Sequence, residues 1–384
     1  MGTIRFGILG CGNIGTTHAK NLTEGKVKDG VLSCVCDKNP KKLDIFREKY
    51  GDSIKYFSTA EQMLASGECD CTIIAIPHYD HPKYAMLSLD AGLNCVVEKP
   101  AGVYTLQVKE MLEHAKKSDK ILGIMFNQRT NPAFRKMKEM VSEGKIGEIK
   151  RTNWIITDWY RTQYYYDTGS WRGTWAGEGG GVLYNQAPHQ LDLFQWIVGM
   201  MPSKVHAHCH FGKWHDVEIE DDVTCYCEYP NGATGVFISC TADAPGTNRF
   251  EITGTRGSLV FENDKLYFTE LEIDEREHCV TSKDGFTRPP AKERVEVDTS
   301  GDNPQHAGIL ANMAATINGT DSLIAPAADG INGVMLANAM LLSEWLGKEV
   351  TLPFDDELFY EELKKRIATS RLKDTSGDDI VRMQ

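Results

Sequence analysis

One lysine stands in a sequence context that suits chemistry on a bound ligand. Lys99 lies between Glu98 and Pro100, directly after the apolar stretch 94–97, which predicts a buried β-strand. Ligands collect at the carboxyl ends of parallel strands, and Pro100 makes the backbone rigid at this point. We therefore expect Lys99 to direct a cation toward the reactive end of a cofactor. A solvent-exposed lysine in a turn is the alternative.

A second group of polar residues follows three consecutive glycines at 179–181, which permit close approach of the backbone. Pro188 suits the first turn of a helix, and His189 is the next residue. Asn185 lies just ahead of this helix, so its side chain and that of His189 are expected to point into one cleft. On spacing alone, packing inside a domain is the simpler explanation of a lone histidine.

A glycine-rich turn near the start of the chain predicts a dinucleotide site. A short apolar strand runs into Gly10, Gly12 and Gly15, and a helical stretch follows. Such glycines allow a tight turn, close approach of a pyrophosphate and close packing of helix on strand. The next predicted strand ends in Asp37, whose carboxylate suits an adenosine ribose and repels a 2′-phosphate. NAD is therefore expected rather than NADP, although Lys38 leaves use of both open.

The elements around these residues alternate between strand and helix in the first third of the chain. This alternation predicts a parallel, doubly wound Rossmann sheet, with ligands at the carboxyl ends of its strands. Two such ends are Ile76–His78 and Val97–Pro100. The predicted strands are 4–9, 31–36, 55–57, 70–76, 94–97 and 121–126, and the predicted helices are 16–22, 60–65 and 79–91.

Beyond residue 127 the pattern changes to alternating stretches typical of an antiparallel sheet. The fold class is therefore α/β, with an N-terminal Rossmann domain and a C-terminal α+β domain that holds a large, mostly antiparallel sheet. We predict a dinucleotide-binding domain at 1–127, a substrate and oligomerisation domain at 128–350, and a C-terminal helix and tail at 351–384. The last helices are expected to return to the first domain. The tail from 371 is expected to be loosely held or to lie over a neighbour.

The amino-acid composition disfavours some classes of binding partner. The 384 residues include 42 Lys and Arg against 54 Asp and Glu, a net charge of −12, which disfavours nucleic acid and anionic membranes. No apolar run is long enough to span a bilayer, and the first strand begins too early for a signal peptide. The eleven cysteines mostly lie among apolar residues. We expect a reduced, cytoplasmic protein that acts on a small molecule.

Aromatic residues are concentrated between positions 154 and 175, where eight of 22 residues are Trp or Tyr. Aromatic faces stack against sugar rings, and Arg161 and Arg172 of this segment can bind hydroxyl groups or a carboxylate. A core or a subunit interface explains the same enrichment equally well. The two interpretations stay open on the sequence.

His206, His208 and His210 alternate on a predicted strand, with His215 close by. Three histidines on one face could bind zinc. A stripe of this period more often covers packing or a subunit contact. We expect no metal.

Together these motifs resemble the Gfo/Idh/MocA family of sugar and polyol oxidoreductases. The resemblance rests on the order and spacing of Gly10–Leu22, Ala75–His81, Glu98–Pro100 and the segment 179–192. In this family the histidine of the last segment is the proposed acid/base, and an aspartate assists it. The chain carries Asn185 at the aspartate position, so the substrate's position or the direction of reaction differs from that of the family's inositol dehydrogenases.

The resemblance implies a set of site residues. Lys99, His189 and Asn185 would be catalytic, and Trp171–Arg172 corresponds to a pair near the nicotinamide. NAD would contact Gly10, Gly12, Asn13, Ile14, Gly15, Asp37, Lys38, Pro77, His78, His81, Glu98, Lys99, Asn127, Trp171 and Arg172. The substrate would contact Tyr160, Arg161, Tyr165, Trp175 and His306.

The implied activity is reversible oxidation of a secondary hydroxyl group, at C3, of a sugar or glycoside, by a homodimer or homotetramer. Three alternatives remain open. An inositol dehydrogenase would use the same residues. A redox-assisted glycosidase would oxidise C3, release the aglycone and recycle NAD. A sensor of sugar or NAD on the same fold would perform no reaction.

Overall fold

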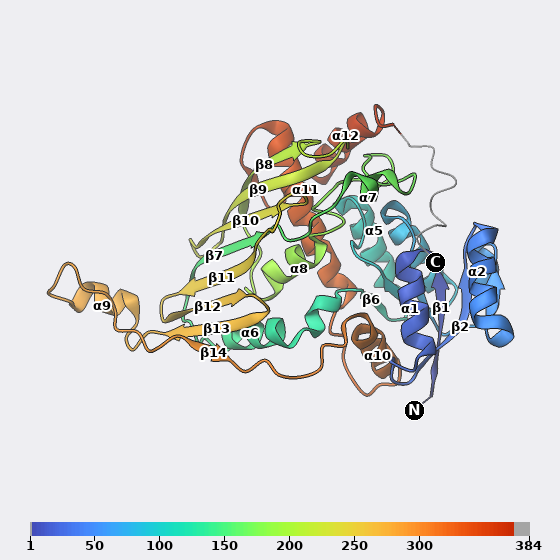
Figure 1. Ribbon diagram of the computed structural model, residues 1–384, viewed down its shortest axis with the longest axis horizontal. Helices are drawn as coiled ribbons and strands as arrows, with labels where there is room; N and C mark the ends of the chain where they lie inside the picture. The colour runs from blue at the N-terminus through green and yellow to red at the C-terminus, as the bar shows by residue number, and fades with distance from the viewer. Residues whose placement is uncertain (1, 372–384) are drawn as a thin grey trace.

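The computed structural model describes residues 2–371, which form two units built around separate sheets (Figure 1). The first unit contains a six-stranded sheet and the second a nine-stranded sheet. Each sheet has its own hydrophobic core. This architecture confirms the predicted fold class. Apart from Arg371, the predicted tail lies outside the described residues.

The six-stranded sheet is parallel throughout, in the order β3-β2-β1-β4-β5-β6. β1 and β4 are neighbours although β2 and β3 separate them in sequence, and ligands of such sheets bind where the winding reverses. The strands are β1 (Ile4–Leu9), β2 (Gly30–Cys36), β3 (Lys55–Phe57), β4 (Cys71–Ile74), β5 (Asn94–Val97) and β6 (Leu122–Ile124). Their connecting helices are α1 (Asn13–Thr23), α2 (Pro40–Tyr50), α3 (Ala60–Leu64), α4 (His81–Asp90) and α5 (Thr105–Ala115).

The nine-stranded sheet has the order β14-β13-β12-β11-β7-β10-β9-β8-β15, and only β7 and β10 pair in parallel. Its buried side chains alternate along each strand and pack with α6, α8 and α11, so one face of the sheet is covered. The strands are β7 (Ile149–Ile156), β8 (Lys204–Phe211), β9 (Glu220–Glu228), β10 (Thr234–Cys240), β11 (Asn248–Gly254), β12 (Gly257–Glu262), β13 (Lys265–Glu270), β14 (Val295–Val297) and β15 (Val350–Thr351). The helices from α6 on are α6 (Pro132–Ser142), α7 (Gln163–Asp167), α8 (Pro188–Trp196), α9 (Glu275–Thr281), α10 (Gln305–Ile317), α11 (Gly330–Leu346) and α12 (Asp356–Ile367).

The chain returns to the first unit near its end. Side chains of α10 pack in the first core, and the backbone N–H of Ile124, at the end of β6, donates to the carbonyl of Ala325 (3.0 Å). α11 then runs between the two sheets, where it contacts both β8 and α5 (Figure 1). The returning segment therefore belongs to both units, as the sequence predicted for the last helices.

An arm that carries α9 extends beyond the edge of the nine-stranded sheet (Figure 1). None of residues 271–300 is buried, and the side chain of Phe286 is 100% exposed. The arm therefore adds no apolar core to the second unit.

Several chemical features bear on the predicted partners. The eleven cysteines all lie within residues 2–371, and all are free. Within the same range, no helix is long and apolar enough to cross a membrane. His206, His208 and His210 are exposed on β8, and no cluster of metal-binding side chains occurs in the described chain.

Candidate active site

The glycine-rich turn between β1 and α1 has the shape that a dinucleotide requires. A Cβ atom at Gly10, where φ is +101°, would lie 2.3 Å from the carbonyl oxygen of Ala75, and one at Gly15 would lie 1.9 Å from that of Gly10. Within residues 2–371 a Cβ atom at Gly12 would meet nothing within 4 Å, and no side chain caps α1. The first N–H groups of α1, at Asn13 and Ile14, are therefore open to a pyrophosphate.

Asp37 follows β2 and faces this turn. One carboxylate oxygen accepts from the backbone N–H of Cys11 (2.8 Å) and the other from that of Asn39 (2.8 Å). Each oxygen retains a lone pair for a ribose hydroxyl. Lys38 is exposed beside it. The residues present thus fit the adenosine half of NAD.

The residues after β4 have different roles. Pro77 is exposed, whereas Nδ1 of His78 lies 3.2 Å from the carbonyl oxygen of Glu178. The ring of His81 is 1% exposed and joins two strand ends, because its nitrogens lie 2.7 Å and 2.8 Å from the carbonyl oxygens of Pro100 and Ile76. The ring of His81 thus positions the backbone at these strand ends, and its contact with the cofactor stays a prediction.

Glu98 is a fixed negative charge directly before Lys99. Burial raises the pKa of Glu98, but its 2.6 Å hydrogen bond to His18 and the charges around it outweigh burial and lower the pKa to about 2. The ring of His306, a predicted substrate residue, lies 5.5 Å from the ring of His18. The charges of Glu98 and Lys99 both act on His306, so this histidine lies near the predicted catalytic lysine.

The amino group of Lys99 reaches the second unit. Its Nζ donates to the carbonyl oxygen of Asn185 (2.8 Å), and its backbone N–H donates to Glu98 (3.2 Å). Burial lowers the pKa of Lys99 below its usual value, and Glu98 partly opposes this shift. Two further N–H donors of the ammonium group stay available for a ligand.

His189 stands in the first turn of α8 and is 8% exposed. Burial lowers the pKa of His189 well below the usual range, and the charge of Lys99 lowers it further. Among residues 2–371 the buried Nδ1 has no hydrogen-bond partner. The imidazole is therefore neutral at neutral pH and able to accept a proton.

Glu178 is a site residue that the sequence did not indicate. Its Oε1 accepts from the side-chain amide of Asn185, and its Oε2 accepts from the backbone N–H of Gly173 (2.7 Å). Burial raises the pKa of Glu178, although Arg172 opposes this effect. A buried carboxyl group thus lies next to Asn185 although position 185 itself is not acidic. Its place directly before the three glycines is the only sequence signal for it.

The three glycines allow the chain to pass close to its own neighbours. Cβ atoms at Gly179, Gly180 and Gly181 would lie 2.4 Å from Val103, 2.1 Å from the Tyr184 ring and 1.9 Å from a carbonyl oxygen, respectively. Any larger residue would displace the segment that carries Asn185.

Arg129 anchors the helix that carries His189. Its guanidinium group is 1% exposed and forms two hydrogen bonds, of 2.8 Å and 2.6 Å, to Asp192 of α8. A third bond of 2.6 Å reaches Asp329 in the returning segment. Residues from three separate parts of the chain therefore hold α8 in place.

Part of the aromatic segment lies at this centre. Nη1 of Arg172 donates to the hydroxyl group of Tyr165 (2.6 Å), and the guanidinium group lies 4.3 Å from the ring centroid of Trp171. The same Nη1 lies 3.9 Å from Glu178. The structure thus brings Trp171, Arg172 and Tyr165 together beside Asn185.

Three other predicted site residues have different surroundings. Trp175 packs in the second core, with its ring centroid 5.6 Å from that of Phe211 and 5.7 Å from that of Trp345, and its substrate contact stays a prediction. Asn127 donates to Gln305 of α10 (2.6 Å), while its own Oδ1 has no partner among residues 2–371. Tyr160 is 52% exposed.

Comparison with known proteins agrees with this geometry. Residues 4–126 match the model of an oxidoreductase family with an NAD-binding Rossmann fold (GFO_IDH_MocA), and residues 134–260 match the GFO/IDH/MocA C-terminal domain. The chain is 23% identical to an inositol 2-dehydrogenase of Rhizobium meliloti, over 89% of this chain and 97% of that protein. It is 26% identical to a D-glucoside 3-dehydrogenase of Escherichia coli, over 60% and 68% of the two chains.

A solved structure of similar shape is the WlbA dehydrogenase of Bordetella pertussis in complex with NADH and UDP-GlcNAcA. The TM-score is 0.76 at 25% identity, with 92% of this chain and 100% of that chain covered. Both family models lie on the two units described above, and the dinucleotide turn and the Lys99 motif fall within the first match. The chain therefore belongs to the Gfo/Idh/MocA family of oxidoreductases and is an NAD-dependent enzyme.

Proposed function

We propose that the enzyme oxidises a secondary hydroxyl group, at C3, of a sugar or glycoside. The observation that carries this proposal is the meeting of a buried, neutral imidazole and a buried ammonium group at the junction of the two units. Lys99 lies close enough to His189 for its charge to lower the pKa of the imidazole. A base and a cation at one hydroxyl oxygen are what removal of its proton requires.

Each residue of the site has a separate role in the reaction. The imidazole of His189 accepts the hydroxyl proton, and the ammonium group of Lys99 donates a hydrogen bond to the same oxygen as negative charge develops on it. Asn185 positions Lys99 through its carbonyl oxygen, and its own side chain is tied to Glu178. NAD held by the turn of Gly10 to Gly15 would supply the hydride acceptor.

The choice of a sugar and of C3 is supported by the relatives' names. One similar protein is a D-glucoside 3-dehydrogenase, and one similar structure holds a nucleotide sugar. The inositol dehydrogenase among the relatives makes inositol the principal comparison in any test. We further propose a cytoplasmic location, since the cysteines are free, and a homodimer or homotetramer.

A substrate panel and two variants test the proposal. NADH formation is followed with free sugars, methyl glucosides and myo-inositol for the wild type, Lys99→Met and His189→Gln. Each variant is expected to lower turnover by a factor of about 100 or more while NADH binding, measured by fluorescence, stays nearly intact. His210→Gln, at an exposed position on β8, is the matched control.

Full activity in either active-site variant would refute the assigned roles. Preference for myo-inositol would identify an inositol dehydrogenase instead. Release of an aglycone without net NADH would identify a redox-assisted glycosidase.

A further inference from the structure

Two arginine side chains lie against one tyrosine ring at the active site. Their Cζ atoms are 4.5 Å (Arg172) and 5.1 Å (Arg161) from the ring centroid of Tyr165. The side-chain amide of Gln186, next to Asn185, also donates to the Tyr165 hydroxyl (3.2 Å). Both guanidinium groups are thus tied, through one ring, to the segment that holds Lys99.

Positive charge exceeds negative charge around this ring. Lys99, Arg161 and Arg172 are the cations, whereas Glu98 is engaged by His18 and Glu178 lies 3.9 Å from Arg172. Within residues 2–371, Arg161 forms no ion pair with a carboxylate, and its buried Nε has no hydrogen-bond partner. Arg161 and Arg172 are half-buried, and an excess of positive charge in such a place favours a ligand that brings negative charge.

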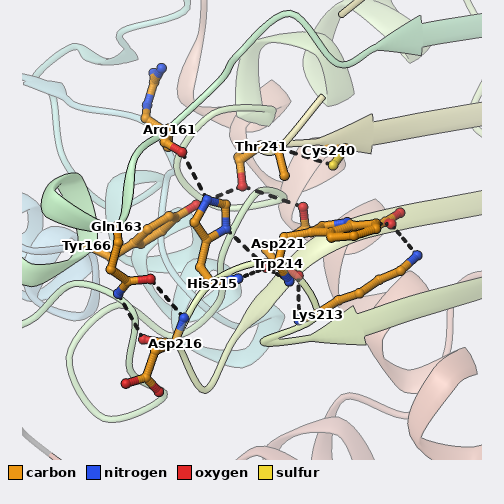
Figure 2. Close-up of polar contacts among 12 residues, drawn as sticks. Arg161, Gln163, Tyr166, Lys213, Trp214, His215, Asp216, Asp221, Cys240 and Thr241 are labelled. Atoms are coloured by element: carbon orange, nitrogen blue, oxygen red, sulfur yellow. Dashed lines mark hydrogen bonds and ion pairs between the residues drawn. The ribbon is translucent and has the colours of Figure 1, made fainter. Parts of the chain in front are cut away.

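The backbone of Arg161 is held in place before any ligand arrives. Its N–H donates to the carbonyl oxygen of Thr241 (2.8 Å), and its own carbonyl oxygen accepts from Nε2 of His215 (2.9 Å). The other ring nitrogen of His215 lies 3.1 Å from the carboxylate of Asp221, which is 0% exposed. Figure 2 shows the guanidinium group of Arg161 directed away from this cluster. The backbone of Arg161 is therefore fixed, while its Nη1 donates to the carbonyl oxygen of Tyr160 (2.9 Å) and its Nε stays available for a ligand.

A second contact strengthens the support. The ring of Tyr166 lies 4.8 Å from that of His215, and its hydroxyl group is 2.8 Å from Oγ1 of Thr241 (Figure 2). Fixed side chains of this kind lose little entropy on binding, which raises both affinity and selectivity.

We infer that Arg161 and Arg172 form an anion subsite and that the substrate is a sugar bearing a negatively charged group, a carboxylate or a phosphate. The inference deepens the proposed function and rests on it. Planar guanidinium groups match both anions, since each presents paired N–H donors. The net charge of −12 does not oppose this assignment, because only nearby charges act strongly on a bound group.

Matched substrates test the subsite directly. NADH formation is measured with methyl glucuronide, its neutral methyl ester, methyl glucoside and methyl glucoside 6-phosphate. The value of kcat/KM for an anionic substrate is expected to exceed that for the neutral ester by about ten- to hundredfold. One or two charge-assisted hydrogen bonds to the anion account for a difference of this size. Whether the uronide or the phosphate is preferred distinguishes the two sources of charge.

Four variants test the roles of Arg161 and His215. Arg161→Gln is expected to bring the ratio of anion to ester toward one, whereas Arg161→Lys retains part of it. His215→Asn, which cannot reach the carbonyl of Arg161, should raise KM for the anion more than it lowers kcat. His215→Gln, whose longer amide can donate to that carbonyl, should restore KM. His210→Gln is the control that leaves all values unchanged.

The possible failures are distinguishable. Equal kcat/KM for anion, ester and glucoside would overturn the subsite while leaving the proposed function in place. If no sugar is oxidised, the proposed function fails, and calorimetric titration of glucuronate and of inorganic phosphate into the NADH complex decides the subsite. If an anion binds and the change Arg161→Gln abolishes this binding, the anion subsite is supported. If neither anion binds, the subsite is overturned.

Discussion

Burial acts on each titratable side chain at the active site in a definite direction. It lowers the pKa of both His189 and Lys99, because the charged form of each loses contact with water. Glu98 is buried as well, but its bond to His18 keeps its pKa at about 2, so its charge is constant at every pH of interest. The shift of His189 favours the neutral imidazole that accepts a proton, whereas the charge of Glu98 opposes the shift of Lys99 and favours its charged amine.

The pH dependence of kcat/KM should reflect both groups. His189 acts when neutral, so activity rises with pH through its pKa, and the acid limb should lie below the ordinary histidine value of 6.5. Lys99 acts when charged, so activity falls as pH rises through a pKa that lies below 10.5. Steady-state rates over the full pH range check both limbs. An acid limb at or above 6.5 would contradict the assignment of His189.

Cofactor preference should depend on Asp37. Replacement by serine removes the carboxylate that repels a 2′-phosphate, and Lys38 next to it can then pair with that phosphate. Asp37→Ser is expected to lower kcat/KM with NAD and to raise it with NADP, as measured with one saturating sugar. An unchanged ratio of the two cofactors would show that the ribose lies elsewhere.

Sequence reasoning identified Lys99, Asn185 and His189 as neighbours because each stands in a short motif. It did not find Glu178, whose contact with Asn185 depends on the folded path of three glycines. It did not predict the packing of Trp175, because composition does not distinguish an indole that stacks on sugar from one packed between Phe211 and Trp345. Motifs reveal local chemistry, whereas partners from distant segments require the fold.

At the scale of elements, a buried ion pair ties α8 to two distant parts of the chain. Arg129, at the turn after β6, joins Asp192 of α8 to Asp329 ahead of α11. The sequence predicted a helix with Pro188 in its first turn, as observed in Pro188–Trp196, but a pair separated by 63 residues leaves no local pattern. Likewise, α1 was predicted from residue 16 and begins at Asn13, because Gly12 ends the turn.

Removal of this anchor should destabilise the protein. Arg129→Met leaves the carboxylate of Asp192 buried without its partner, which costs about 3–5 kcal/mol in the free energy of unfolding. Urea denaturation measures the loss, and turnover should fall as well because α8 carries His189. Arg135→Met, at an exposed position of α6, is the matched control and should change stability by less than about 0.5 kcal/mol. Equal effects of the two changes would refute the anchoring role.

At the scale of the whole molecule, the boundary predicted at residue 127 separates the sheets but not the cores. α10 and the start of α11 pack against the Rossmann sheet, although some 180 residues lie between β6 and α10. Strand and helix patterns predicted both sheets, whereas the side on which a returning helix packs is decided by tertiary contacts alone.

The two units should therefore unfold together. NADH binds the folded form, so a concentration of about 100 times its Kd stabilises the native state by about 2.7 kcal/mol. Because the returning segment belongs to both cores, the whole thermal transition should shift upward as one step. Calorimetry checks this. Two transitions, of which only one responds to NADH, would show that the units are independent.

The central claim is that hydride leaves the C3 carbon of a sugar ring, and transfer of an isotope tests it most directly. The enzyme is incubated with NAD and the preferred sugar carrying deuterium at C3, and the NADH formed is analysed by mass spectrometry. The account predicts NADH heavier by one deuterium, a slower rate than with unlabelled sugar, and loss of both signals in His189→Gln. Unlabelled NADH formed at an unchanged rate would contradict it.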